Sequence, residues 1–84
     1  MHDFHLADMI YRAIMDYAQK NSWQKVKSVT IELGSIVEHG EEILPANLAF
    51  NLKLLAEGGI AEGLEVKILK ISGGDWILKE VDAE

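Results

Sequence analysis

The amino-terminal stretch carries the pattern of one amphipathic helix. Its apolar residues recur three and four positions apart, so they share one helical face. These residues are Leu6, Met9, Ile10, Ala13, Ile14 and Tyr17. Asp3 is suited to the N-cap and Asn21 to a left-handed C-cap. The sequence therefore predicts a helix from about Asp3 to Lys20.

A half-buried strand and a second helix are predicted next. Apolar and polar residues first alternate with a period of two, which is typical of a strand with one face in the core. The apolar positions of this strand are Val29, Ile31 and Leu33. Beyond Gly40 the apolar positions form a helical stripe, Leu44, Leu48, Leu52 and Leu55. Because Pro45 fits a helix only in its first turn, we expect a helix that follows Gly40 and ends at the Gly-Gly pair, residues 58–59.

Two further strands, residues 64–71 and 76–81, are predicted before the end of the chain. The central Gly-Gly of residues 72–75 suits a tight hairpin between them. With no internal repeat or linker, the order helix, strand, helix, strand, strand indicates one α+β domain over residues 1–84. Two helices would cover one face of a three-stranded sheet. Strand order stays open, because the connection through the second helix either crosses over to a parallel strand or reverses direction.

Composition narrows the class of protein. The 84 residues include 8 basic and 14 acidic side chains, which gives a formal net charge of −6. The basic residues are scattered singly, so the basic face of a nucleic-acid binder is missing. The sequence has neither a signal-peptide pattern nor an apolar run long enough to span a membrane. We therefore expect a cytoplasmic protein with no nucleic-acid or membrane partner.

Candidate catalytic groups are few. Ser35 and Ser72 lie in turns without the context of a nucleophile elbow, and the glycine pairs form no phosphate-binding motif. The Glu41-Glu42 pair is typical of a solvated helix start. We therefore expect that the chain is not an enzyme. Since it contains no cysteine, any metal site must use nitrogen or oxygen ligands.

The first three residues have a specific chemistry available to them. A free Met1 amine, the backbone nitrogen and imidazole of His2, and the backbone nitrogen of Asp3 can form a plane of four nitrogens. Such square-planar nitrogen sites favour Ni²⁺ and Cu²⁺. Residues at a helix start also have N–H groups that no helical carbonyl accepts. The predicted metal ligands are therefore Met1, His2 and Asp3.

Plainer interpretations of the same residues stay open. A histidine near a chain end is often simply solvated, and spacing alone does not separate this from metal binding. His5 is either an axial ligand or a solvated residue of the first helical turn, and His39 fits a loop surface. Trp23 and Trp76 are interpreted as packing residues of the core or its rim.

Several segments together carry a resemblance to a known family. They are Met1-His2-Asp3 with Leu6-Ala7, residues 26–34, residues 48–58 with 60–66, and residues 72–76 with 81–82. Over nearly the whole chain they resemble the HypA/HybF hydrogenase-maturation nickel chaperones. The resemblance implies a nickel metallochaperone, or its nickel-binding core, that holds Ni²⁺ at Met1, His2 and Asp3. It also implies delivery to the large subunit of nickel-iron hydrogenase with a maturation GTPase as partner, and urease as another client of some members.

The chain also departs from the family pattern. The two Cys-x-x-Cys pairs of the family's zinc ribbon are missing at the seam 71/72, so we expect no zinc. The connection between Gly34 and Leu48 is several residues longer than usual, and Asp3 and Ser35 stand where the family usually has Glu. Backbone ligation should survive the change at Asp3, whereas the tuning of the site by its surroundings depends on that side chain.

A second interpretation belongs to a different class of function. The chain could be a metal-free interaction module that docks to a maturation partner or, as a homodimer, to a second copy, with His2 incidental. An apolar rim containing Phe4, Trp23 or Trp76 would serve this docking. A third, weaker interpretation is an acidic domain that binds a small molecule. Titration with Ni²⁺ separates the first interpretation from the other two.

Overall fold

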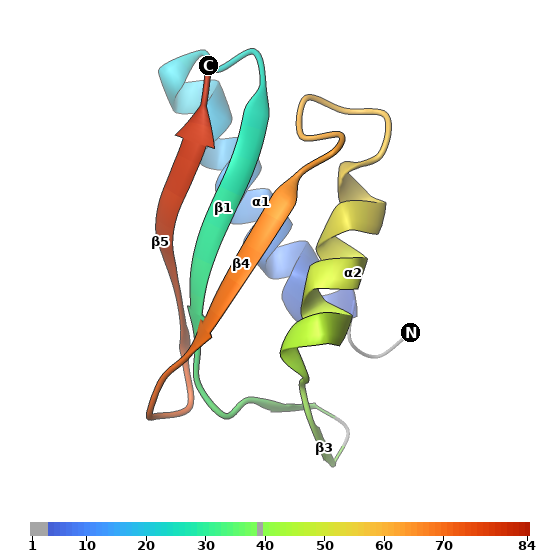
Figure 1. Ribbon diagram of the computed structural model, residues 1–84, viewed down its shortest axis with the longest axis vertical. Helices are drawn as coiled ribbons and strands as arrows, with labels where there is room; N and C mark the ends of the chain where they lie inside the picture. Colours follow the sequence, from blue (N-terminus) through green and yellow to red (C-terminus); the bar gives the residue numbers. More distant parts are fainter. Residues whose placement is uncertain (1–3, 39) are drawn as a thin grey trace.

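The computed structural model describes residues 4–38 and 40–84. In chain order its elements are α1 (Phe4–Asn21), β1 (Val26–Leu33), β2 (Val37–Glu38), β3 (Glu41–Glu42), α2 (Pro45–Ala56), β4 (Glu65–Lys70) and β5 (Trp76–Ala83). The main sheet has the strand order β4-β1-β5. α1 crosses behind this sheet, and α2 lies along its β4 side (Figure 1). The α+β class, with two helices and a three-stranded sheet, is confirmed.

The core lies between the two helices and the inner face of the sheet. Its fully buried residues are Leu6, Ala7, Ile10, Ile14 and Ala18 of α1, Leu48, Leu52 and Ala56 of α2, Val26, Val29, Ile31 and Leu33 of β1, and Ile43, Ala61 and Leu64 of the connections. Trp23 and Trp76 are partly buried against this core, as predicted. The buried stripe of α1 is narrower than expected, because Met9 and Tyr17 are 41% and 51% exposed.

The sheet is built around β1. β4 runs parallel to β1, with Val29 opposite Val66, so the chain crosses over through α2. β5 runs antiparallel to β1, with Ile31 opposite Leu78 and Thr30 opposite Glu80. Lys79 is therefore an extra residue in β5, which is a β-bulge. The sheet is thus mixed, with one parallel and one antiparallel pair of strands. The first of its three strands along the chain, β1, lies at the centre, which answers the question of strand order that the sequence left open.

The predicted tight hairpin between the last two strands is wrong. β4 and β5 lie on opposite sides of β1, so residues 71–75 must wrap around the end of the central strand. Three backbone hydrogen bonds hold this connection. The Ile71 N–H donates to the Leu33 carbonyl at 3.0 Å, the Gly34 N–H donates to the Asp75 carbonyl at 2.8 Å, and the Ser35 N–H donates to the Gly73 carbonyl at 2.8 Å. A Gly-Gly signal marks the turn but does not reveal that another strand lies between its two arms.

The second helix begins later than predicted. α2 starts at Pro45, and the residues before it form a small antiparallel ladder in which Val37 lies opposite Glu42. Glu41 and Glu42 therefore belong to a strand and not to a helix start. Leu44 is the N-cap residue and is 56% exposed, so it does not continue the buried stripe.

The end of the first helix also differs in detail. Asn21 is the last residue of α1, and its side-chain amide donates to the Tyr17 carbonyl at 2.8 Å. The left-handed conformation falls on the next residue, Ser22, with φ of 56°. Within the described ranges, neither helix is long and apolar enough to cross a membrane.

Candidate metal centre

The predicted ligands Met1, His2 and Asp3 lie outside the described residues, as does His39. The structure does describe the start of α1, which directly follows these three residues in the sequence. α1 begins at Phe4, and Leu6 and Ala7 are 2% and 0% exposed in its first turns. The chain that follows the motif is therefore anchored in the core within a few residues. Such anchoring fixes where the amino-terminal segment leaves the domain.

His5 is exposed in the first turn of α1. One turn later, Asp8 pairs with Arg12 at 2.9 Å. Over residues 4–38 and 40–84, no three His, Asp or Glu side chains lie close enough together to hold a metal ion. The described part of the chain thus brings no competing ligand set together. Among the described residues, His5 is therefore not part of a group of three such side chains.

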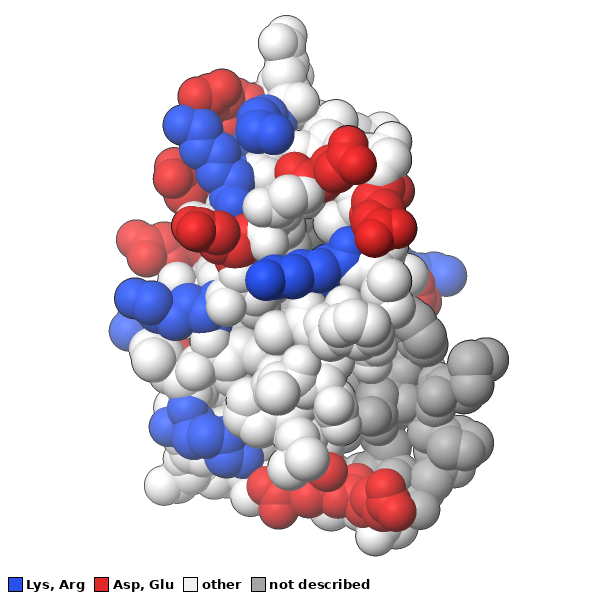
Figure 2. Space-filling model, turned by 45° about the vertical axis from the view of Figure 1, so that its right-hand side comes forward, with Lys and Arg blue, Asp and Glu red and all other residues white. Residues whose placement is uncertain are grey.

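One side of α2 presents apolar side chains to solvent. Leu44, Phe50 and Leu54 are 56%, 61% and 39% exposed. Figure 2 shows this side as a largely uncharged surface below a single basic side chain, with acidic side chains gathered at its lower end. The lower end is where β3, with Glu41 and Glu42, precedes α2. A helix with apolar residues on both its buried and its exposed faces is typical of one that contacts a partner.

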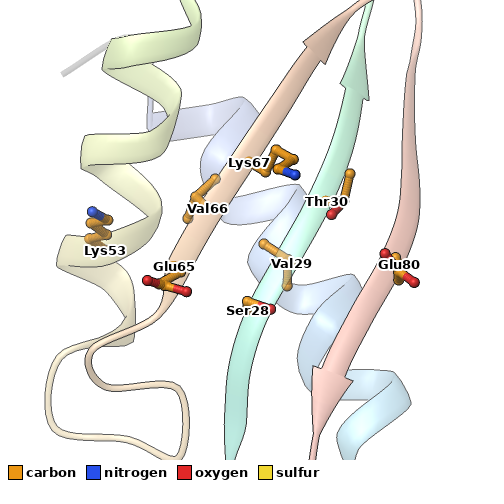
Figure 3. Close-up of a pocket in the computed structure, with 8 residues that line it drawn as sticks. All are labelled: Ser28, Val29, Thr30, Lys53, Glu65, Val66, Lys67 and Glu80. Carbon is orange, nitrogen blue, oxygen red and sulfur yellow. The ribbon is translucent and has the colours of Figure 1, made fainter.

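The outer face of the sheet is hollowed but holds no catalytic set. The hollow is about 560 Å³ and is lined by residues that include Ser28, Thr30, Lys53, Glu65, Lys67 and Glu80 (Figure 3). In the sheet register Thr30 lies between Lys67 of β4 and Glu80 of β5, so opposite charges flank a hydroxyl. No nucleophile with an activating base is found among these lining residues.

Two side chains with shifted pKa values lie at the other end of the sheet. Lys27 donates a hydrogen bond to the Glu84 carboxylate at 2.7 Å. This contact raises the pKa of Lys27 and lowers the pKa of Glu84. Both groups are exposed, so solvent weakens the pair. This end of the sheet is remote from the start of α1 beside α2 (Figure 1).

Comparison with known proteins decides the family. The family model described as hydrogenase/urease nickel incorporation, metallochaperone, hypA matches residues 1–75. The chain belongs to the HypA family. A family of metallochaperones is not one of catalysts, which confirms the expectation that the chain is not an enzyme. The resemblance noted in the sequence is confirmed as well.

Curated relatives support the assignment, and a solved structure shares the fold. Hydrogenase maturation factor HypA of Pyrococcus furiosus is 39% identical over an alignment of 89 positions, and that of Thermococcus kodakarensis is 35% identical. Each alignment covers 96% of this chain and 61% of the relative, so the chain spans under two thirds of their length. The solution structure of the Ni metallochaperone HypA from Helicobacter pylori matches the fold with a TM-score of 0.67. It is 11% identical, and the match covers all of this chain and 87% of that one.

Proposed function

We propose that this chain is the nickel-binding core of a HypA metallochaperone, with Ni²⁺ held by nitrogen atoms of Met1, His2 and Asp3. Membership of a nickel-incorporation family supports the choice of metal. The observation that carries the site is the sequence itself, which begins with a motif able to form a planar four-nitrogen site directly before a helix. The described residues supply no other cluster of metal-binding side chains.

The chemistry of this site couples metal binding to protons. The Met1 amine and the His2 imidazole must be neutral to donate, and each backbone amide that ligates must lose its proton. Binding therefore releases protons, so affinity rises with pH and acid releases the metal. Nitrogen ligands select Ni²⁺ over Mg²⁺ and Ca²⁺, but by the usual divalent order Cu²⁺ competes at least as well. Protonation of the ligands therefore also provides a route for the release of Ni²⁺.

We further propose that residues 1–84 act as one domain that lacks the family's zinc segment at 71/72 and binds no zinc tightly. The direct wrap of residues 71–75 around the end of β1 supports this, since hydrogen bonds donated by Gly34 and Ser35 hold the connection against the end of that strand. The partners that we propose are the large subunit of a nickel-iron hydrogenase and a maturation GTPase. The names of the curated relatives, which are hydrogenase maturation factors, support the first of these.

The alternative is a metal-free module that docks to a maturation partner. The exposed apolar residues Leu44, Phe50 and Leu54 favour it, because such a face is suited to protein contact. The two functions are compatible in one molecule, with the metal at the start of α1 and the contact on α2. They differ in one measurable respect, which is whether the isolated chain binds Ni²⁺.

The test is a calorimetric and absorbance titration of Ni²⁺ into the chain with a free Met1 amine. We expect one Ni²⁺ per chain with the absorbance of a square-planar complex. An added residue before Met1, acetylation of its amine, or His2→Ala should each abolish binding without changing the circular dichroism spectrum. His5→Ala is the matched control and should leave one site. Undiminished one-to-one binding by the extended chain would contradict the proposed ligands, and no binding by the free chain would favour the interaction module.

A further inference from the structure

Met9 is exposed, although its spacing in the sequence places it on the predicted apolar stripe of α1. Its side chain is 41% exposed, whereas the next residue, Ile10, is fully buried. Met9 is therefore not a core residue. His5, one helical turn earlier, is exposed as well. The first turns of α1 thus carry two solvent-facing side chains with metal-binding atoms, an imidazole and a thioether.

The helix brings these two side chains together. His5 and Met9 are four residues apart within α1, which runs unbroken from Phe4 to Asn21. Side chains at this spacing are neighbours on one helical face, with their Cβ atoms about 5–6 Å apart. Long side chains such as that of methionine lean toward the amino-terminal end of a helix. The Met9 side chain therefore leans toward the turn that carries His5, where one ion can contact both.

Neighbouring charges do not occupy this pair. Asp8 lies beside Met9 in the sequence, but its carboxylate accepts a hydrogen bond from the Arg12 guanidinium at 2.9 Å. These two opposite charges offset each other on the surface next to Met9. In the described part of the chain, the imidazole of His5 forms no ion pair with a carboxylate. Both His5 and Met9 are therefore available to a ligand.

The two ligand types select a soft monovalent cation. Thioether sulfur favours Cu⁺, an ion for which two ligands in a linear arrangement are enough. The amino-terminal end of a helix disfavours cations, so an ion held by charge alone is unfavourable here. A soft ion instead forms largely covalent bonds with sulfur and nitrogen. Residues 4–38 and 40–84 contain no group of three His, Asp or Glu side chains for a divalent ion, and a two-ligand soft site is consistent with that finding.

We propose that His5 and Met9 form a two-ligand site for a soft monovalent cation, which is Cu⁺ or its redox-stable analogue Ag⁺. An imidazole nitrogen of His5 and the sulfur of Met9 hold the ion between them. The site shares no residue with the nickel site proposed at Met1, His2 and Asp3, so it does not depend on that proposal. A soft ion bound on α1 leaves the nitrogen ligands free. The chain then separates a soft monovalent ion from Ni²⁺ by ligand type.

Calorimetric titration with Ag⁺ in chloride-free buffer tests the site. The parent chain for this titration carries His2→Ala, so that the amino-terminal imidazole does not compete for the ion. His5→Ala and Met9→Leu should each weaken Ag⁺ binding about tenfold or more, because even residues behind a metal ligand change affinity by this amount. Leucine keeps the volume and helix propensity of methionine but lacks its sulfur. Met15→Leu is the matched control, because Met15 packs against the core, and it should bind Ag⁺ as the parent does.

A double variant distinguishes one shared ion from two separate ions. When two side chains hold the same ion, either substitution alone already destroys the chelate. The losses of affinity for His5→Ala and Met9→Leu should therefore not add up in the chain that carries both. Losses that do add up would show that the two side chains bind Ag⁺ independently, and this result would overturn the proposal.

Nuclear magnetic resonance locates the bound ion. The ε-methyl resonance of Met9 and the ring resonances of His5 should shift together as Ag⁺ is added, and Cu⁺ kept reduced under anaerobic conditions should cause the same shifts. The Met15 methyl resonance should stay in place, and Zn²⁺ should not move that of Met9. A Met9 methyl resonance that does not respond to Ag⁺ would overturn the proposal, as would an Ag⁺ affinity that Met9→Leu leaves unchanged. Circular dichroism checks that each variant is folded.

Discussion

Gly34 follows β1 directly and lies beneath the connection that wraps around the end of that strand. A Cβ atom placed on Gly34 would lie 2.9 Å from the Asp75 carbonyl oxygen, and the Gly73 carbonyl lies closer still. Both obstacles are backbone atoms held by hydrogen bonds, so they cannot rotate away. We expect Gly34→Ala to lower the free energy of unfolding by about 1–3 kcal/mol, measured by chemical denaturation.

Gly74→Ala is the matched control for this substitution. The nearest atom to a Cβ at Gly74 is the Ser35 carbonyl oxygen at 3.6 Å, an ordinary contact. The control should change the free energy of unfolding by less than about 0.5 kcal/mol. Equal losses for the two variants would show that the connection is sensitive to any side chain and that the close approach at Gly34 is not the cause.

The proposed metal ligands can be predicted from the sequence, whereas the structural role of Gly34 cannot. The ligands Met1, His2 and Asp3 are neighbours in the chain, so their joint chemistry is visible without a fold, and it remains a prediction. The role of Gly34 depends on Gly73 and Asp75, which are distant in the chain and close in space. No local pattern reports such an approach. The resemblance to the family marked Gly34 as the end of a strand but gave no reason for a glycine.

At the scale of elements, the packing of α1 on β1 can be tested through one residue from each. Ile10 and Ile31 are both 0% exposed within the same core. Truncation removes buried methylene groups and leaves a cavity that the neighbours fill only in part. We expect Ile10→Ala and Ile31→Ala each to lower the free energy of unfolding by about 2–4 kcal/mol. Denaturation midpoints in urea measure the effect.

Matched controls lie on the same elements or in the same sheet. Met9 neighbours Ile10 on α1 but is 41% exposed, and Ile77 of β5 is 49% exposed. Met9→Ala and Ile77→Ala should therefore cost much less than the substitutions of the buried isoleucines. If the four variants lost equal stability, the division of α1 into a buried and an exposed face would be wrong.

Elements with a strong local pattern were predictable, and elements set by distant contacts were not. The helix over α1 and the alternation over β1 follow from periodicity, because each shows one apolar face to the core. The ladder of β2 and β3 has only four residues, with two glutamates in β3, so it carries no apolar alternation. The pairing of β4 and β5 with β1 instead of with each other is a property of the whole sheet. Turn residues alone do not indicate which strands pair.

At the scale of the whole molecule, the proposed ligands and the buried residues occupy separate stretches of the sequence. The buried residues run from Leu6 to Leu64, whereas the proposed ligands are three consecutive residues that precede α1. Consecutive ligands remain together in an unfolded chain, so nickel should bind the folded and unfolded states with similar affinity. A ligand stabilises a fold only through its preference for the folded state. Saturating Ni²⁺ should therefore leave the melting temperature nearly unchanged, as measured by calorimetry.

A chelator should likewise leave the melting temperature and helix content of the purified chain unchanged. A rise of many degrees with Ni²⁺ would instead show that the fold brings ligands together from separate elements. Helix loss on chelation would show that a metal holds the core. Either result would contradict a site confined to Met1, His2 and Asp3.

The central place of β1 also sets the order in which the chain can fold. β1 is made early, yet its partners β4 and β5 come from the last third of the sequence. The helices can form as soon as they leave the ribosome, but the sheet must wait for the closure of long loops, which slows folding. During synthesis Val29 and Ile31 stay without cross-strand neighbours until β4 emerges, and they gain those of β5 only at the end. The amino-terminal motif is thus exposed to the cell for some time before the domain behind it becomes rigid.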